Sequence, residues 1–348
     1  MSKINFISIN IGSTGLKFCM SRYVRRSFII EYLYSYYFQN SISASNLQRD
    51  VLKKEILNAF RNLNLKYKKF VISIPEQLVY SRLIEIPFVS EKEIIDSILW
   101  TIKPLLPVDI SLVNVSHIVV GTKYVNNSQY LEVFVVAVPK EIVNEYKYVF
   151  DDLNLELIAI ETEAVALSRL VKVLCNEIVQ NQDVMVLDFG YKSSTVIILR
   201  YGVPIFSQSI EVGSFGLTKS ISVDLGIDFN QAEYLKTNIG IDLSIEQNKK
   251  IYFAMLPFLE ALSSEISRII LYYKDKINVN GLRKLILSGG GSTLKNLDLF
   301  LAEKFNMDVF RLSNYHNKLL FNTKSISLPN IFLPSFEVCM GLSMKGYV

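Results

Sequence analysis

The chain has 348 residues, of which 50% are hydrophobic and 20% charged, and its formal net charge is +4. This length predicts two domains or one bilobed body, and the apolar content excludes a disordered chain. The mild charge argues against a nucleic-acid-binding domain, and three scattered cysteines with two histidines do not form a zinc site. No apolar run reaches the roughly 18 residues of a membrane span and no signal-peptide pattern opens the chain, so we expect a cytoplasmic protein.

The first predicted unit is a β-hairpin near the N-terminus. In the segment INFISINIGSTGLKFCM, an apolar strand leads into Asn10-x-Gly12, a polar turn follows, and a second strand continues the chain. Residues 27–38 predict a third strand, and KKFVISIPEQ predicts a further strand that Pro75 ends. The chain therefore begins as a β-rich unit with a glycine turn.

The next predicted elements are a strand, VYSRLIEIPF, and a helix. The helix is expected to begin at a capping box formed by Ser90 and Glu93 and to stop at Pro104. One face of it is apolar at helical spacing, through Ile94, Ile95, Ile98, Leu99 and Ile102.

Two further strands around an Asn126-Asn127 turn, and a helix over KEIVNEYKYVFDDLNL, complete this middle region. The order β-α-β-β-α predicts a compact α+β insert over residues 82–157. Within the insert, we expect Trp100, Leu105 and Leu106 to pack in the core.

The second half of the chain begins with an echo of the first hairpin. After a strand and a helix in LELIAIETEAVALSRLVKVLCNE, the segment DVMVLDFGYKSSTVIIL repeats the order of apolar strand, Asp188-x-Gly190, polar turn and strand. Tyr201-Gly202 predicts a second turn into a strand over residues 203–210. One hairpin unit occurring twice predicts two similar lobes, which could bind a ligand between them.

The remaining predicted elements are mostly helical. Gly213 opens one helix, Asp228 and Gln231 cap a second, and Pro257 is expected near the first turn of a long amphipathic third. A buried strand, three glycines and a helix follow in LRKLILSGGGSTLKNLDLFLAEKF, and EVCMGLSMKGYV predicts a short last helix. Strands and helices mixed throughout the chain indicate an α/β protein.

The two hairpins carry the residue types that hold phosphates. Backbone N–H groups, hydroxyls and one cation come from Asn10, Gly12, Ser13, Thr14 and Lys17. The second hairpin supplies similar groups from Gly190, Ser193, Ser194 and Thr195. Its Asp188 suits a Mg²⁺ ion held through water, because Mg²⁺ combines few carboxylates with waters and substrate phosphates.

Two later segments could hold the rest of a nucleotide. An anion or a sugar edge would suit the turn of Gly289, Gly290, Gly291 and Ser292, which lies between a strand and a helix. Glu233 and Lys236 lie on one helix face and could bind a base or ribose, with a surface ion pair as the alternative. Gly213, at the entry to its helix, completes this candidate set.

These segments together resemble the actin-like ATPase superfamily. The phosphate motifs are NIGSTGLK and LDFGYKSST, the adenosine motif is LILSGGGSTLKNL, and the connecting segments are ETEAVALSRL and EVCMGLSMKG. Within the superfamily the chain most resembles the PilM family of type IV pilus assembly, through LIEIPFVSEKEIIDSILWTIKPLLPVDI and EVGSFGLTKSISVDLGIDFNQAEYLK. The resemblance covers essentially the whole chain.

The resemblance implies two actin-like, RNase H-like lobes with mixed five-stranded sheets, and an α+β insert subdomain placed as in the cell-division protein FtsA. The first lobe would comprise residues 1–81 and 158–182, and the insert residues 82–157. The second lobe would comprise residues 183–348, with 237–256 as a candidate small subdomain.

The resemblance also implies ATP or ADP with Mg²⁺ between the lobes, the ion being held through water by Asp188 and Asn10. The family usually has aspartate where Asn10 stands, and an amide brings no charge to the ion. The catalytic candidates are Asp188, Glu161 and Glu163, although the two glutamates could instead be solvated or cap a helix. We therefore predict slow or absent turnover, at most a slow ATPase.

The implied function is a cytoplasmic ATP-binding scaffold of type IV pilus assembly, peripheral to the inner membrane. It would recruit a PilN-like inner-membrane protein through that protein's N-terminal cytoplasmic peptide, and it could communicate with the pilus motor ATPases. Direct membrane insertion is not expected, while self-association and the choice among pilus, type II secretion and competence systems stay open.

Two alternative functions remain. An FtsA-like polymerising cell-division protein is disfavoured because no basic amphipathic helix ends the chain. A small-molecule kinase of the same superfamily is disfavoured because the insert offers no obvious catalytic acid.

Overall fold

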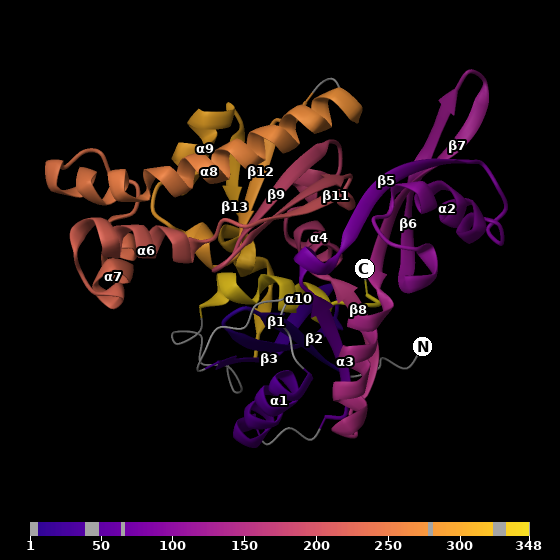
Figure 1. The fold of residues 1–348 in the computed structure, drawn as a ribbon, viewed down its shortest axis with the longest axis horizontal. Coiled ribbons are helices and arrows are strands. Elements are labelled where there is room, and N and C mark those ends of the chain that lie inside the picture. Colours follow the sequence, from indigo (N-terminus) through magenta and orange to yellow (C-terminus); the bar gives the residue numbers. More distant parts are fainter. Residues whose placement is uncertain (1–5, 39–48, 64–66, 278–280, 323–331, 348) are drawn as a thin grey trace.

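A computed structural model of the protein describes residues 6–38, 49–63, 67–277, 281–322 and 332–347. Three β-sheets, of six, five and three strands, organise this part of the chain. Figure 1 shows the six-stranded sheet in the lower part of the view, the five-stranded sheet above it, and the three-stranded sheet at the right.

The six-stranded sheet contains the N-terminal hairpin. Its order is β14-β3-β2-β1-β4-β8, and the strands are β1 (Ile7–Gly12), β2 (Gly15–Val24), β3 (Ser27–Tyr37), β4 (Lys69–Ile74), β8 (Glu156–Thr162) and β14 (Leu320–Phe321). β1, β2 and β3 are antiparallel neighbours, whereas β4 is parallel to both β1 and β8. The sequence predicts five strands, and the sixth is β14, a two-residue strand too short to show an alternating pattern.

The five-stranded sheet repeats the same opening. Its order is β11-β10-β9-β12-β13, and the strands are β9 (Asp183–Phe189), β10 (Ser194–Arg200), β11 (Val203–Ile210), β12 (Lys284–Ser288) and β13 (Asp308–Arg311). β9, β10 and β11 are again antiparallel, and β12 is parallel to β9. Tyr201 and Gly202 have φ values of 53° and 79°, which is the left-handed geometry of a tight hairpin turn. The repeated hairpin is therefore confirmed.

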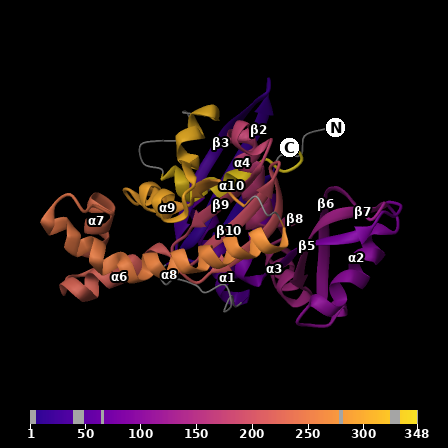
Figure 2. The same ribbon diagram turned by 90° about the horizontal axis from the view of Figure 1, so that it is seen from above.

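Two helices lie between the large sheets, and most of the others pack outside them (Figures 1 and 2). α4 (Glu163–Leu174) and α10 (Glu337–Ser343) share a buried core with residues of both sheets, and α5 (Asn176–Val179) follows α4. The six-stranded sheet is covered by α1 (Arg49–Leu63) and α3 (Lys140–Asp152). The five-stranded sheet is covered by α6 (Ser214–Leu225), α7 (Phe229–Ile239), α8 (Glu246–Lys276) and α9 (Leu297–Phe305).

The three-stranded sheet forms a unit of its own with one helix. Its order is β5-β7-β6, with β5 (Tyr80–Pro87), β6 (Val113–Val125) and β7 (Ser128–Pro139), and α2 (Ile94–Ile102) packs on it. Buried Ile94, Ile98 and Ile102 provide the contact face of α2. The domain boundaries drawn from the sequence stay a prediction.

Two expectations about the middle region were wrong. α2 begins at Ile94 rather than at Ser90, because the Ser90 N–H and hydroxyl both donate to the Glu93 carboxylate, at 3.1 and 2.6 Å. Trp100 is 78% exposed and Leu105 is also exposed, because only every fourth residue of this short helix faces the sheet. Leu106 is partly buried against that core, as expected.

Two helices differ from the sequence analysis as well. No element was predicted over α1, which buries Leu52, Ile56 and Ala59 against the six-stranded sheet. Pro257 lies well inside α8 rather than in its first turn, because α8 already begins at Glu246. The capping box of Asp228 and Gln231 at the start of α7 is confirmed.

Candidate functional site

A cavity of about 820 Å³ lies where the two hairpin turns meet the glycine turn after β12. Three of its walls are the β1–β2 turn, the β9–β10 turn and the N-terminal part of η2 (Glu76–Leu78), the 3-10 turn that follows β4. Most of the predicted site residues line it: Asn10, Gly12, Ser13, Thr14, Lys17, Glu163, Asp188, Gly190, Ser193, Thr195, Glu233, Lys236, Gly289, Gly290 and Gly291. Segments far apart in the sequence therefore meet in one cavity large enough for a small-molecule ligand.

Four predicted site residues do not line this cavity. The Ser194 hydroxyl donates to the Val212 carbonyl at 2.5 Å, and the Ser292 hydroxyl donates to the Gly289 carbonyl at 2.6 Å, so both support neighbouring backbone. Gly213 caps α6, and a Cβ atom there would lie 2.3 Å from the Tyr191 carbonyl oxygen. Gly213 thus allows α6 to dock closely on the second hairpin turn. Glu161 is the fourth.

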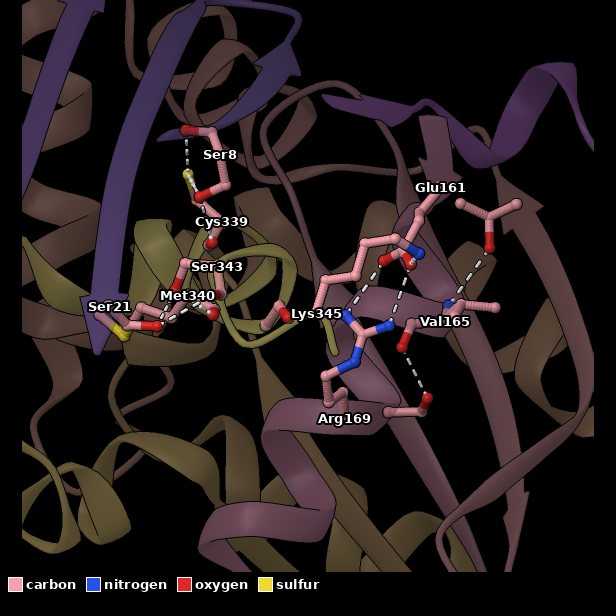
Figure 3. A network of polar contacts seen from close by, with 12 residues as sticks. Ser8, Ser21, Glu161, Val165, Arg169, Cys339, Met340, Ser343 and Lys345 are labelled. Atoms are coloured by element: carbon pink, nitrogen blue, oxygen red, sulfur yellow. Dashed lines mark hydrogen bonds and ion pairs between the residues drawn. The ribbon is translucent and has the colours of Figure 1, made fainter. Parts of the chain in front are cut away.

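Glu161 belongs to the contact between α4 and α10 shown in Figure 3. It pairs with the Arg169 guanidinium, at 3.0 Å, and with Lys345. Arg169 also donates to the Gly341 carbonyl at 2.8 Å. Burial disfavours the charged form of Glu161, but Arg169 and Lys345 outweigh burial and lower its pKa. In this structure Glu161 joins two helices and is not placed to orient a water in the cavity.

Asn10, at the end of the first hairpin's leading strand, uses its side-chain amide as a donor. The amide is oriented with its nitrogen towards the Ser73 hydroxyl, at 2.9 Å, and the Glu163 carboxylate, at 3.0 Å. Asn10 is 5% exposed, so these bonds are shielded from water. The amide therefore holds the Glu163 side chain in place by donating a hydrogen bond to it, and an ionised aspartate at this position would have no proton to donate.

Glu163 and Glu76 form a close acidic pair. The Glu76 N–H donates to the Glu163 carboxylate and the Ala164 N–H donates to the Glu76 carboxylate, both at 3.3 Å. Burial raises the pKa of Glu163 to about 8, with further increases from Asp188 and Glu76, while the Asn10 hydrogen bond opposes the rise. Burial also raises the pKa of Glu76 to about 6. A carboxyl group whose pKa lies near neutral pH, as that of Glu163 does, can serve in acid–base chemistry.

Lys17 and Asp188 are two of the charged groups that line the cavity without a direct partner among the described residues. Neither side chain makes a hydrogen bond or an ion pair with another residue of the described ranges. Burial raises the pKa of Asp188 to about 7, with Glu337 adding to the rise and Lys17 opposing it. Burial likewise lowers the pKa of Lys17, against the attraction of Asp188. An anion beside Lys17 and a cation beside Asp188 would relieve both costs of burial.

The glycine turn is shaped to pass close to Asp188. Gly289 has a φ of 81°, and a Cβ atom there would lie 2.2 Å from an Asp188 carboxylate oxygen. The Gly289 N–H donates at 2.9 Å to Glu337, the buried first residue of α10, which also accepts from the Ser288 hydroxyl. No side chain larger than hydrogen fits at Gly289, so the backbone itself forms this wall of the cavity.

Glu233 and Lys236 form the far wall. The Lys236 ammonium, only 6% exposed, donates to Glu233 at 2.7 Å and to the Thr218 hydroxyl at 2.8 Å. The predicted pair is thus an ion pair that lines the cavity and not a surface pair. The second carboxylate oxygen of Glu233 makes none of these bonds and is available to a ligand.

The sequence analysis missed many residues that line the cavity, and three of them matter for its chemistry. Glu76, Glu211 and Phe332 line it, and Phe332 is half exposed beside Gly290. Only Glu76 carried a signal, because a glutamate directly after a buried strand and a proline is unusual in a turn. Among the described residues, no group of three His, Cys, Asp or Glu side chains could hold a metal ion without help from a ligand.

A family model described as type IV pilus assembly protein PilM matches residues 8–347. The chain belongs to the PilM family. The match spans both hairpins, the glycine turn and α10, so the cavity lies wholly within the PilM region. The resemblance inferred from the sequence is thereby confirmed.

Solved structures place this PilM-family chain in a broader fold group. It is similar to a chain of the PilM-PilN type IV pilus biogenesis complex, with a TM-score of 0.82 and 19% identity over 99% of each chain. It is also similar to MreB5 of Spiroplasma citri bound to AMPPNP, with a TM-score of 0.53 and 13% identity over 92% of this chain and 94% of the other. The ethanolamine utilization protein EutJ of Carboxydothermus hydrogenoformans gives a TM-score of 0.53 and 11% identity, over 99% and 91%. At these identities the matches show the actin-like fold.

Proposed function

We propose that this PilM-family protein binds ATP or ADP in the cavity between its two large sheets. The observation that carries the proposal is the meeting of both hairpin turns and the glycine turn around an unpaired Lys17. The Ser13, Thr14, Ser193 and Thr195 hydroxyls line the same cavity, and none bonds another side chain within the described ranges. These groups suit phosphates, and Glu233 with Lys236 would meet the ribose or base.

Asp188 is the residue we expect to hold Mg²⁺ through water. Its carboxylate faces the cavity and has no other partner among the described residues, which fits a magnesium ion completed by water and phosphate oxygens. The Asn10 oxygen could accept from a metal-bound water, but its amide nitrogen already holds Glu163. Bound Mg²⁺ would neutralise phosphate charge.

We expect the protein to hydrolyse ATP slowly at most. Glu163 is the candidate for orienting a water, and its raised pKa means that it is largely protonated at neutral pH without a ligand. One carboxylate fewer at position 10 also leaves less charge to fix a cation. Nucleotide would then act as a structural ligand that sets the relation of the two sheets.

The role of this scaffold is type IV pilus assembly with a PilN-like partner. The similarity to the PilM-PilN complex supports a partner of this kind, and a short cytoplasmic peptide of that partner would bring the protein to the inner membrane. In the described ranges no helix combines the length and apolar character of a membrane span. The family match favours pilus assembly over cell division or small-molecule phosphorylation.

The test is calorimetry of ATP and ADP with and without Mg²⁺, with phosphate release measured on the same sample. We expect binding that Lys17→Met weakens by about tenfold or more, the value of a charge-assisted contact. Phosphate release should be negligible in the wild type. Brisk release, or ATP affinity unchanged in Lys17→Met, contradicts the proposal.

The partner is tested separately, by calorimetry with a synthetic N-terminal peptide of the PilN-like protein from the same pilus system. A scrambled peptide is the control. We expect saturable binding of the native order alone, and equal binding of both peptides rejects this part of the proposal.

A further inference from the structure

Glu76 is a buried carboxylate between the two large sheets. It begins η2, directly after strand β4 of the six-stranded sheet, and it is 4% exposed. One carboxylate oxygen accepts a hydrogen bond from the hydroxyl of Ser207, which lies on β11 of the five-stranded sheet. Glu76 therefore bridges two sheets that meet at the cavity.

The other half of Glu76 is bonded to the first turn of α4. Its second carboxylate oxygen accepts from the Ala164 N–H, and its own N–H donates to Glu163. These two bonds are reciprocal, so η2 and the start of α4 hold each other. A displacement of β11 would consequently act on Glu163 through a single side chain.

A second contact to Ser207 comes from the three-stranded sheet and does not involve Glu76. Ser81, at the start of β5, lies 2.6 Å from Ser207, hydroxyl to hydroxyl, and its hydroxyl also donates to the Ser207 carbonyl at 3.0 Å. Ser81 fixes β11 without touching α4. A change at Ser81 removes the Ser81 contact alone, whereas a change at Ser207 removes the hydroxyl from both contacts.

A structural role alone does not require a charge at this position. No cation pairs with Glu76 among the described residues, and burying an unpaired carboxylate costs stability. A glutamine could accept from Ala164 and donate to Ser207 with the same reach. The contacts of Glu76 therefore depend on the length of its side chain rather than on its charge.

We propose that Glu76 is a positioning residue that couples Glu163 to the five-stranded sheet. It keeps Glu163 and the first turn of α4 directed at the cavity while β11 stays at the separation seen here. This inference rests on the proposed function, because a nucleotide bound between the two large sheets would set the distance between them. The Glu76 bonds themselves join protein groups only.

The experiment is hydrogen exchange by mass spectrometry on the nucleotide-free and Mg·ATP-mixed full chain. The reporter is the peptide that contains the start of α4, and a peptide of α1 is the internal control. We compare wild type with E76A, E76D, E76Q, S207A and S81A. Thermal melting of each variant records global stability.

In E76A, E76D and S207A we expect exchange at the start of α4 to rise about fivefold, the equivalent of one lost hydrogen bond of about 1 kcal/mol. E76Q should behave like wild type, and S81A should change this peptide by less than about twofold. S207A breaks the coupling from β11, so it keeps the test valid if E76A does not fold.

Equal exchange in S81A and S207A would overturn the proposal, because any contact to Ser207 of β11 would then suffice. Unchanged exchange in E76A and S207A overturns it as well. Lack of ATP binding by the wild type rejects the proposed function instead, and it leaves the nucleotide-free comparison intact.

Discussion

The two hairpins that face the cavity share one outline but present different polar side chains. In the first, Asn10 is buried and uses its amide to hold Ser73 and Glu163. In the second, Asp188 faces the cavity without a partner among the described residues. The repeated backbone unit therefore performs two tasks: the first copy orients a protein side chain, and the second remains available to a ligand.

The largest predicted effect comes from making the first hairpin like the second. Asn10→Asp replaces two donated hydrogen bonds with a carboxylate facing Glu163, so we expect a loss of about 3 kcal/mol in the free energy of unfolding. Urea unfolding without nucleotide or Mg²⁺ measures this loss. Ser13→Asp, which adds a charge elsewhere in the cavity, is the control and should cost less. Equal stability of Asn10→Asp and wild type would remove the distinction between the hairpins.

The second prediction concerns the buried carboxyl group of Glu76 and the dependence of protein stability on pH. Burial raises the folded-state pKa of Glu76 to about 6 from its usual value of 4.5. The stability from this proton is full below pH 4.5 and lost as pH rises through 6, whereas a glutamine does not titrate. Relative to wild type, Glu76→Gln should gain up to about 2 kcal/mol between pH 4.5 and pH 8. Urea unfolding across this range measures the gain, and a pH-independent difference would contradict the burial argument.

The third prediction makes the second hairpin like the first. Asp188→Asn removes the candidate Mg²⁺ ligand but keeps the shape of the side chain. We expect the Mg²⁺-dependent part of ATP affinity to fall by about tenfold, with metal-free binding changed little. Calorimetry with and without Mg²⁺ separates the two. Ser193→Ala, on the same turn, is the control and should retain the Mg²⁺ effect. A full Mg²⁺ effect in Asp188→Asn would remove Asp188 as the ligand.

The smallest prediction concerns Glu161, which lies outside both hairpins. Lys345→Ala removes one of its two cations and leaves Arg169 in place. We expect a loss of about 0.5–1 kcal/mol in stability and no change in ATP affinity, because the pair is partly exposed. Thermal melting and calorimetry test the two statements. A change in ATP affinity would show that Glu161 contributes to nucleotide binding, contrary to its placement here.

Local patterns in the sequence predicted most of the fold. The two hairpins, the glycine turn and the α7 capping box rest on neighbouring residues, and the structure has each of them. Two elements were missed: β14 has only two residues, whereas α1 has an amphipathic pattern over RDVLKKEILNAFRNL that the sequence analysis overlooked. Trp100 was misplaced because it was assigned to the core on its apolar character alone, although it lies outside the apolar stripe of its helix.

The cavity was predicted less completely than the fold. Its glycine turns could be recognised because glycine is needed where backbone passes close to a ligand or to another chain segment. The bond from Asn10 to Glu163, and that from Ser207 to Glu76, join residues far apart in the sequence. No spacing rule links such residues, since only the pairing of sheets brings them together. For the same reason Glu161 and Glu163 could not be distinguished until α10 was in place.

The crossing of α4 and α10 is tight at one point. A Cβ atom at Gly341 would lie 2.0 Å from the Ala166 carbonyl oxygen, so even alanine there must push the two helices apart. α10 is tied to the six-stranded sheet through Ser8 and Cys339, at 2.8 Å (Figure 3). The yielding partner is then α4, whose first residue is Glu163. A methyl group at Gly341 would therefore displace α4 and, with it, the Glu163 carboxylate. Gly341 itself does not line the cavity that contains this carboxylate.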